Sequence, residues 1–139
     1  MGRKNSPSAN KELNELIAQY ETARAENRQL YLDGDQLADI ADQYAAGRKF
    51  NEAQEVITYG LHLHPDSTDL LVEQAYLYLD TGKIPLAKKV VESITDEYDT
   101  DVKMLKAELM LNEGQLENAR NVLDTIEDAD ELETIINIV

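Results

Sequence analysis

The sequence predicts an all-α fold of stacked antiparallel helix pairs, and two observations lead to this expectation. First, the chain repeats itself at an offset of 34 residues and then of 32 residues. The columns that align include Ala41, Ala75 and Ala107 in one helix and Ala53, Ala87 and Ala119 in the next. Second, apolar residues within each copy recur about every 3.6 residues, in two separate runs. A series of helix pairs that stack on one another forms a solenoid.

Residues 1–31 are expected to form a short tail and an amphipathic helix. Ser6 suits the N-cap, and Pro7 suits the first helical position, where its missing N–H would be unpaired anyway. One face of this helix carries the apolar residues Leu13, Leu16, Ile17, Tyr20 and Ala23. The helix does not fit the repeat, so we expect it to cap the N-terminal end of the solenoid. The alternative is that its polar end, residues 24–29, does not pack and the helix drifts or dimerises.

Three repeats follow, and each contains a helix, a tight turn and a second helix. In the second copy, Gly82 is expected to close the first helix in a left-handed conformation, and Pro85 lies in the first turn of the next helix. Asp66 or Ser67 is expected to cap the helix that follows Pro65. The predicted bounds within residues 32–131 are 34–67, 68–99 and 100–131.

Residues 132–139 are expected to begin a fourth repeat that is cut short. The apolar residues there are Ile135, Ile136, Ile138 and Val139. We expect that the sequence is a fragment of a longer array, since natural arrays generally end in a solubilising cap. The alternative is that another subunit covers this apolar end, in which case the chain self-associates through it.

The copies resemble tetratricopeptide repeats over residues 32–131. The resemblance rests on the small residues of the two aligned columns and, in the first copy, on Tyr44, Phe50, Gly60 and Pro65. Two features depart from the family pattern: Lys103 replaces a large apolar residue in the third copy, and Gly47 stands one residue early in its turn. The resemblance implies a right-handed superhelical solenoid that acts as a protein-binding scaffold and not as an enzyme.

The charge and the residue types limit the chemistry of the protein. The chain has a net charge of -15, with 28 acidic and 13 basic residues, so binding to nucleic acids or to anionic membranes is not expected. With no Cys and only two His, His62 and His64, no metal or cofactor is expected; side chains two residues apart on a helix do not face the same ion. No apolar signal segment follows the basic N-terminus, so we expect a cytoplasmic protein.

The candidate binding residues are those that, by the resemblance, line the concave face of the array. They are Asp35, Ala38, Asp42, Asp69, Val72, Tyr76, Leu79, Asp80, Asp101, Met104, Glu108, Leu111 and Asn112. Family members that clamp acidic peptide tails need cationic donors on this face, and the set contains no Lys or Arg. The expected partner is therefore a protein or peptide with apolar anchors and basic flanks. Two alternatives stay open: a small acidic secretion-type chaperone, and a docking or regulatory region of an enzyme whose catalytic domain lies outside this chain.

Overall fold

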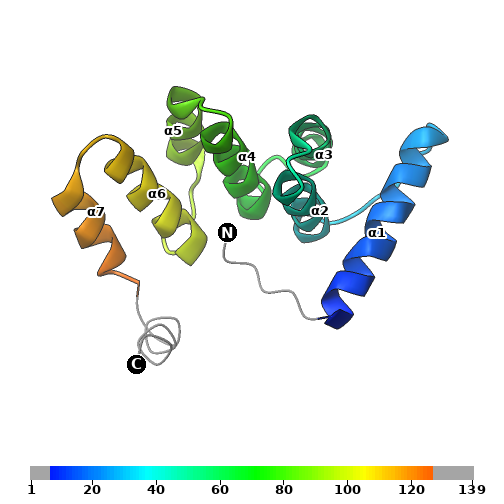
Figure 1. Cartoon of the computed structure of the whole chain (residues 1–139), viewed down its shortest axis with the longest axis horizontal. Coiled ribbons are helices and arrows are strands. Elements are labelled where there is room, and N and C mark those ends of the chain that lie inside the picture. The colour runs from blue at the N-terminus through cyan, green and yellow to red at the C-terminus, as the bar shows by residue number, and fades with distance from the viewer. Residues whose placement is uncertain (1–6, 127–139) are drawn as a thin grey trace. The chain divides into compact units, whose positions relative to one another are not determined.

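The computed structural model describes residues 7–126, and these residues form seven α-helices and no strands (Figure 1). The helices are α1 (Pro7–Ala25), α2 (Gly34–Ala46), α3 (Phe50–Leu63), α4 (Thr68–Asp80), α5 (Ile84–Ser93), α6 (Thr100–Asn112) and α7 (Leu116–Leu123). The all-helical prediction is confirmed, whereas the right-handed superhelical course stays a prediction. The expected cap at Ser6 and the expected fourth repeat at 132–139 lie outside the described residues.

Side-chain caps begin the first helix of each repeat. Asp33 caps α2, where its carboxylate accepts a hydrogen bond from the backbone N–H of Gln36 at 2.8 Å and the Gln36 side chain accepts one from the Asp33 N–H at 3.1 Å. The Ser67 hydroxyl accepts from the N–H of Leu70 at 3.3 Å at the start of α4. Asp99 caps α6 in the same way. These caps satisfy backbone donors that a helix N-terminus leaves unpaired.

The turns between paired helices share one hydrogen-bond pattern. Gly82 and Gly114 adopt left-handed conformations with φ of 78° and 79°, as the sequence predicts. In the first repeat the left-handed residue is Arg48, with φ of 61°, and Gly47 has a φ of -86°. Arg48 occupies the same repeat column as the two glycines, which explains why Gly47 seems misplaced by one residue.

The backbone closes each of these turns with a bond that spans five residues. The N–H of Lys49 donates to the carbonyl of Tyr44 at 2.8 Å, and the N–H of Lys83 donates to Tyr78 at 2.7 Å. The third turn repeats the bond from Gln115 to Met110 at 2.8 Å. This bond is the signature of a Schellman motif, and the left-handed residue is what allows it to form.

The described helices belong to two compact units, Met1–Glu73 and Gln74–Val139, and the boundary falls within α4. In the first unit the largest fully buried side chains are Leu37, Ile40, Val56, Ile57 and Leu70. In the second unit a buried cluster contains Ala75, Ala87, Val91, Leu105 and Leu109. All six alanines of the two aligned columns are buried, which confirms that they are packing residues.

In the first unit, α1 packs against α2 and is joined to the first repeat by polar contacts. The Tyr44 hydroxyl donates to the Glu21 carboxylate at 2.5 Å. Arg24 pairs with Glu55 of α3 at 2.9 Å. The segment after α1 is held as well, because the Tyr59 hydroxyl donates to the carbonyl of Leu30 at 2.8 Å. These contacts attach α1 to both helices of the first repeat.

Candidate functional site

The second unit presents most of the predicted binding residues on α4 and α6, and we call these residues the α4–α6 surface. They are Tyr76, Leu79, Asp80, Asp101, Met104, Glu108, Leu111 and Asn112. Met104 and Leu111 are 41% and 48% exposed, although both are large and apolar. Tyr76 and Leu79 are half-buried, because they pack against the cluster around Ala75 and Leu105. The surface therefore combines anchored apolar side chains with accessible ones.

Two carboxylates lie close together on this surface. Partial burial raises the pKa of Glu108, and the nearby charge of Asp80 raises it further. Both effects show that the ionised Glu108 lacks full compensation from its surroundings. A cation placed beside these two groups would relieve the repulsion between them.

Two basic side chains that contact α6 or its C-terminal end are engaged away from the α4–α6 surface. The ammonium group of Lys103 donates to the carbonyl of Thr125 at 2.9 Å, just after α7. Lys88 of α5 pairs with Glu113 at 2.8 Å. Lys103, which departs from the family pattern, thus has a structural contact of its own. Neither residue neutralises the pair formed by Asp80 and Glu108.

The amide of Asn112 bonds within its own helix. Its Nδ2 atom donates to the carbonyl of Glu108 at 3.0 Å. This bond satisfies one of the carbonyls that the C-terminal turn of α6 leaves without a helical partner. The Asn112 side chain therefore helps to close the helix at the edge of the surface, and its oxygen atom is the group that could accept a bond from a ligand.

The first unit places its share of the predicted residues differently. Asp35 is exposed, whereas Asp42 and Asp69 are half-buried. Ala38 and Val72 are only 0% and 3% exposed, so a partner cannot reach their side chains in this structure. The candidate surface therefore excludes these two residues. Their burial depends on neighbouring helices, which the repeat register does not reveal.

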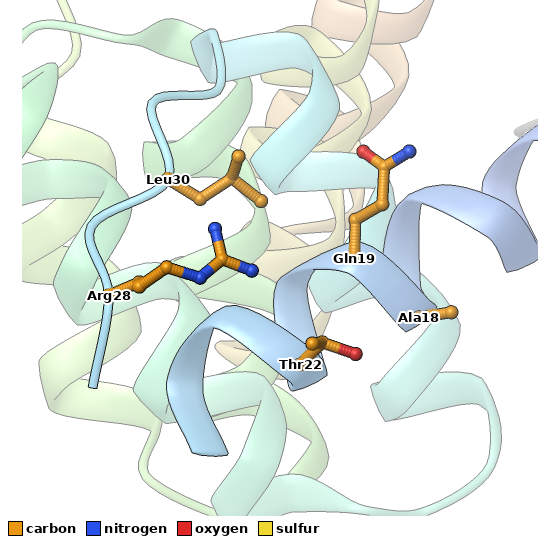
Figure 2. Close-up of a pocket in the computed structure, with 5 residues that line it drawn as sticks. All are labelled: Ala18, Gln19, Thr22, Arg28 and Leu30. Carbon is orange, nitrogen blue, oxygen red and sulfur yellow. The ribbon is translucent and has the colours of Figure 1, made fainter. Parts of the chain in front are cut away.

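Three surface hollows of the first unit escape the sequence reasoning. The one in Figure 2 has a volume of about 370 Å³ and is lined by Ala18, Gln19, Thr22, Arg28 and Leu30. Its Arg28 pairs with Glu26 at 2.7 Å. A second hollow of about 460 Å³ is lined by Arg24, Gln54, Glu55, Thr58, Tyr59 and His62. The third, of about 200 Å³, is lined by Tyr20, Glu21, Arg24, Tyr44, Glu52 and Glu55.

Two further searches concern chemistry and membranes. Within residues 7–126, no group of three or more His, Cys, Asp or Glu side chains is arranged to hold a metal ion. In the same part of the chain, no helix combines the length and the apolar character that crossing a bilayer requires.

The repeated helix pairs and the accessible apolar surface define the class: this is a helical-repeat protein of the kind that binds other proteins. Residues 44–109 match the family model of the tetratricopeptide repeat. The chain therefore carries tetratricopeptide repeats, and the match runs from the end of α2 into α6. No match was found among curated proteins or among solved structures. This family typically acts as a non-catalytic module for protein–protein interaction.

Proposed function

We propose that the α4–α6 surface binds a segment of another protein that carries apolar anchors and Lys or Arg flanks. The observation that carries the proposal is the position of the exposed Met104 and Leu111 beside the like-charged Asp80 and Glu108. Burial of the two apolar side chains would supply affinity, because apolar area removed from water contributes roughly 25 cal/mol per Å². The two carboxylates would select basic flanks.

The charge distribution supports the same partner class. Residues 32–139 hold 24 acidic and eight basic side chains, whereas residues 1–31 hold four and five. An acidic field of this kind speeds encounter with a basic segment and opposes an acidic one. Among the residues that the sequence predicts for the first unit, Asp35, Asp42 and Asp69 keep some exposure and are proposed to favour basic partners too.

The experiment is a peptide array followed by fluorescence anisotropy on the best binders. Peptides with spaced Leu or Met anchors and Lys or Arg flanks are expected to bind best, and their affinity is expected to fall as salt is added, because exposed charges are screened. Strong binding of acidic peptides, with basic ones silent, would contradict the proposal.

A matched pair of variants locates the site. The double variant Met104→Ser with Leu111→Ser is expected to lower the affinity at least tenfold, since it removes both exposed anchors. The control is Leu116→Ser on α7, because Leu116 is even more exposed but lies outside the α4–α6 surface. Equal losses in the two proteins would show that the peptides adhere to apolar surface without selecting this site.

A further inference from the structure

The smallest hollow of the first unit contains an arrangement that the α4–α6 surface does not explain. We call it the Tyr20 hollow, and its lining comes from α1, α2 and α3 as Tyr20, Glu21, Arg24, Tyr44, Glu52 and Glu55. Three carboxylates face one guanidinium group there, so the lining carries an excess of negative charge. The hollow lies within the first unit and shares no residue with the α4–α6 surface.

Existing contacts fix most of the polar groups in the lining. Glu21 accepts the hydrogen bond from the Tyr44 hydroxyl at 2.5 Å, and Glu55 accepts from Arg24 at 2.9 Å. Glu52 makes no hydrogen bond or ion pair within the described part of the chain. The internal contacts therefore neutralise one carboxylate, and the charges of Glu21 and Glu52 stay uncompensated.

The hydroxyl of Tyr20 is the second and independent observation. The residue is only 5% exposed, and its Oη atom has no hydrogen-bond partner among the described residues. The ring is held in place by a tilted contact with Tyr59, with 6.4 Å between ring centroids. A buried hydroxyl without a partner opposes folding, because it has lost its hydrogen bonds to water. A donor that enters the hollow would recover this loss.

The hydroxyl remains neutral in this setting. Burial raises the pKa of Tyr20; Arg24 acts in the opposite direction and Glu55 acts in the same direction as burial. A neutral phenol accepts a hydrogen bond and also donates one. The influence of Arg24 and Glu55 places the hydroxyl close to charged groups that also line the hollow.

We propose that the Tyr20 hollow binds the ammonium group of a lysine side chain from a protein partner. An ammonium group has three donors, which match the Tyr20 hydroxyl and the carboxylates of Glu21 and Glu52. The rings of Tyr20 and Tyr44 offer apolar walls to the alkyl stem of the lysine. A guanidinium ligand fits less well, because Arg24 already places one beside Glu55. This site belongs to the first unit and extends the proposed function to a second contact.

The first test is an NMR titration of the ¹⁵N-labelled full chain with a blocked Gly-Lys-Gly peptide. The control peptide contains norleucine, which keeps the alkyl stem and lacks the ammonium group. The lysine peptide is expected to shift the amide signals of residues 20–24 and 52–55, and the norleucine peptide is expected to leave them in place. Equal shifts from both peptides would overturn the proposal. It would also fail if the shifts fell on α4 and α6 alone, and that result would leave the proposed function standing.

The second test uses the variant Tyr20→Phe, which keeps the ring and removes only the hydroxyl. It is expected to weaken lysine-peptide binding about tenfold and to leave the melting temperature unchanged or higher, because an unpaired buried group is gone. A clear fall in melting temperature would mean that the hydroxyl serves the fold through a bond of its own, and it would overturn the proposal.

A charge-neutral pair of variants separates the site from the general acidity. Glu52→Gln is expected to weaken lysine-peptide binding about tenfold. Glu12→Gln, on an exposed position of α1 outside the hollow, is expected to change it less than twofold. The same loss in both variants would assign the effect to net charge and overturn the site.

Discussion

The first and third repeats use one column of the repeat in opposite ways. Ala38, Val72 and Met104 are aligned by the offsets of 34 and 32 residues, yet their exposed fractions are 0%, 3% and 41%. In the first unit this column holds small or branched residues that pack inside. In the second unit it holds a long, flexible side chain that reaches the surface, of the type that adapts to varied partners. Repeat register therefore predicts where a residue stands on its helix and not whether a partner can reach it.

The largest expected effect comes from exchanging the two roles. Ala38→Met inserts a long side chain at a fully buried position and is expected to lower the free energy of unfolding by about 1–3 kcal/mol. Met104→Ala is expected to lower it by less than about 0.5 kcal/mol, because the side chain is accessible. Urea denaturation measures both. A larger loss for Met104→Ala would mean that Met104 is a core residue and that the comparison is wrong.

The turns give a second comparison between the units. Gly82 has a φ of 78°, and Gly82→Ala is expected to cost about 1–2 kcal/mol, because a Cβ atom is strained in the left-handed region even though nothing crowds it here. Arg48 already bears this strain, and its guanidinium lies 5.4 Å from the centroid of the Phe50 ring. Arg48→Gly relieves the strain and loses that contact, so a net gain of about 0.5 kcal/mol is expected. Thermal melts of both variants measure these changes, and a stabilised Gly82→Ala would refute the turn assignment.

The aligned tyrosines distinguish the units by their contacts. Tyr44→Phe removes the hydrogen bond to Glu21 and is expected to cost about 1 kcal/mol. Tyr78→Phe is expected to be nearly neutral, since no side-chain hydrogen bond joins Tyr78 to the described residues. Urea denaturation of the two variants at neutral pH compares them directly. Equal losses would show that the bond between α1 and the first repeat contributes nothing.

The same tyrosine predicts a pH dependence. Burial raises the pKa of Tyr44, and the hydrogen bond to Glu21 raises it further, so the folded state holds the phenolic proton more tightly than the unfolded state does. This stability is fully present below the unfolded-state pKa of about 10 and is lost as the pH rises above it. The difference in unfolding free energy between the parent chain and Tyr44→Phe should therefore shrink above about pH 10. A constant difference would contradict the assigned cause.

The sequence reveals the repeated helices because their signals are local. The alanine columns require close packing wherever helix pairs stack, and Gly82 and Gly114 mark the ends of helices by their own backbone preference. By contrast, the Tyr20 hollow depends on side chains from three helices, with Tyr20 and Glu55 separated by 35 positions in the chain. Arg48 escapes prediction for another reason: the turn forces its conformation, against the preference of the residue itself. On the α4–α6 surface the residue types were predictable, and their accessibility was not.

The smallest expected effect on stability tests the surface of the second unit. Burial and the charge of Asp80 raise the pKa of Glu108, so the folded state prefers the protonated form. Its stabilising contribution is complete below the unfolded-state pKa and is lost as the pH rises through the folded-state value. At neutral pH the charged Glu108 therefore opposes folding, and Glu108→Gln is expected to raise the free energy of unfolding by roughly a few tenths of a kcal/mol, after allowance for solvent screening.

The same variant is expected to weaken the binding of basic peptides and to flatten its dependence on salt, since one of the two carboxylates is gone. Glu117→Gln on the exposed start of α7 is the control, because it removes an equal charge outside the α4–α6 surface. Anisotropy titrations at two salt concentrations and denaturant melts measure the two effects separately. A variant that loses stability together with affinity would show that Glu108 supports the fold. A gain in stability with a loss of affinity is the outcome that a surface kept acidic for a partner requires.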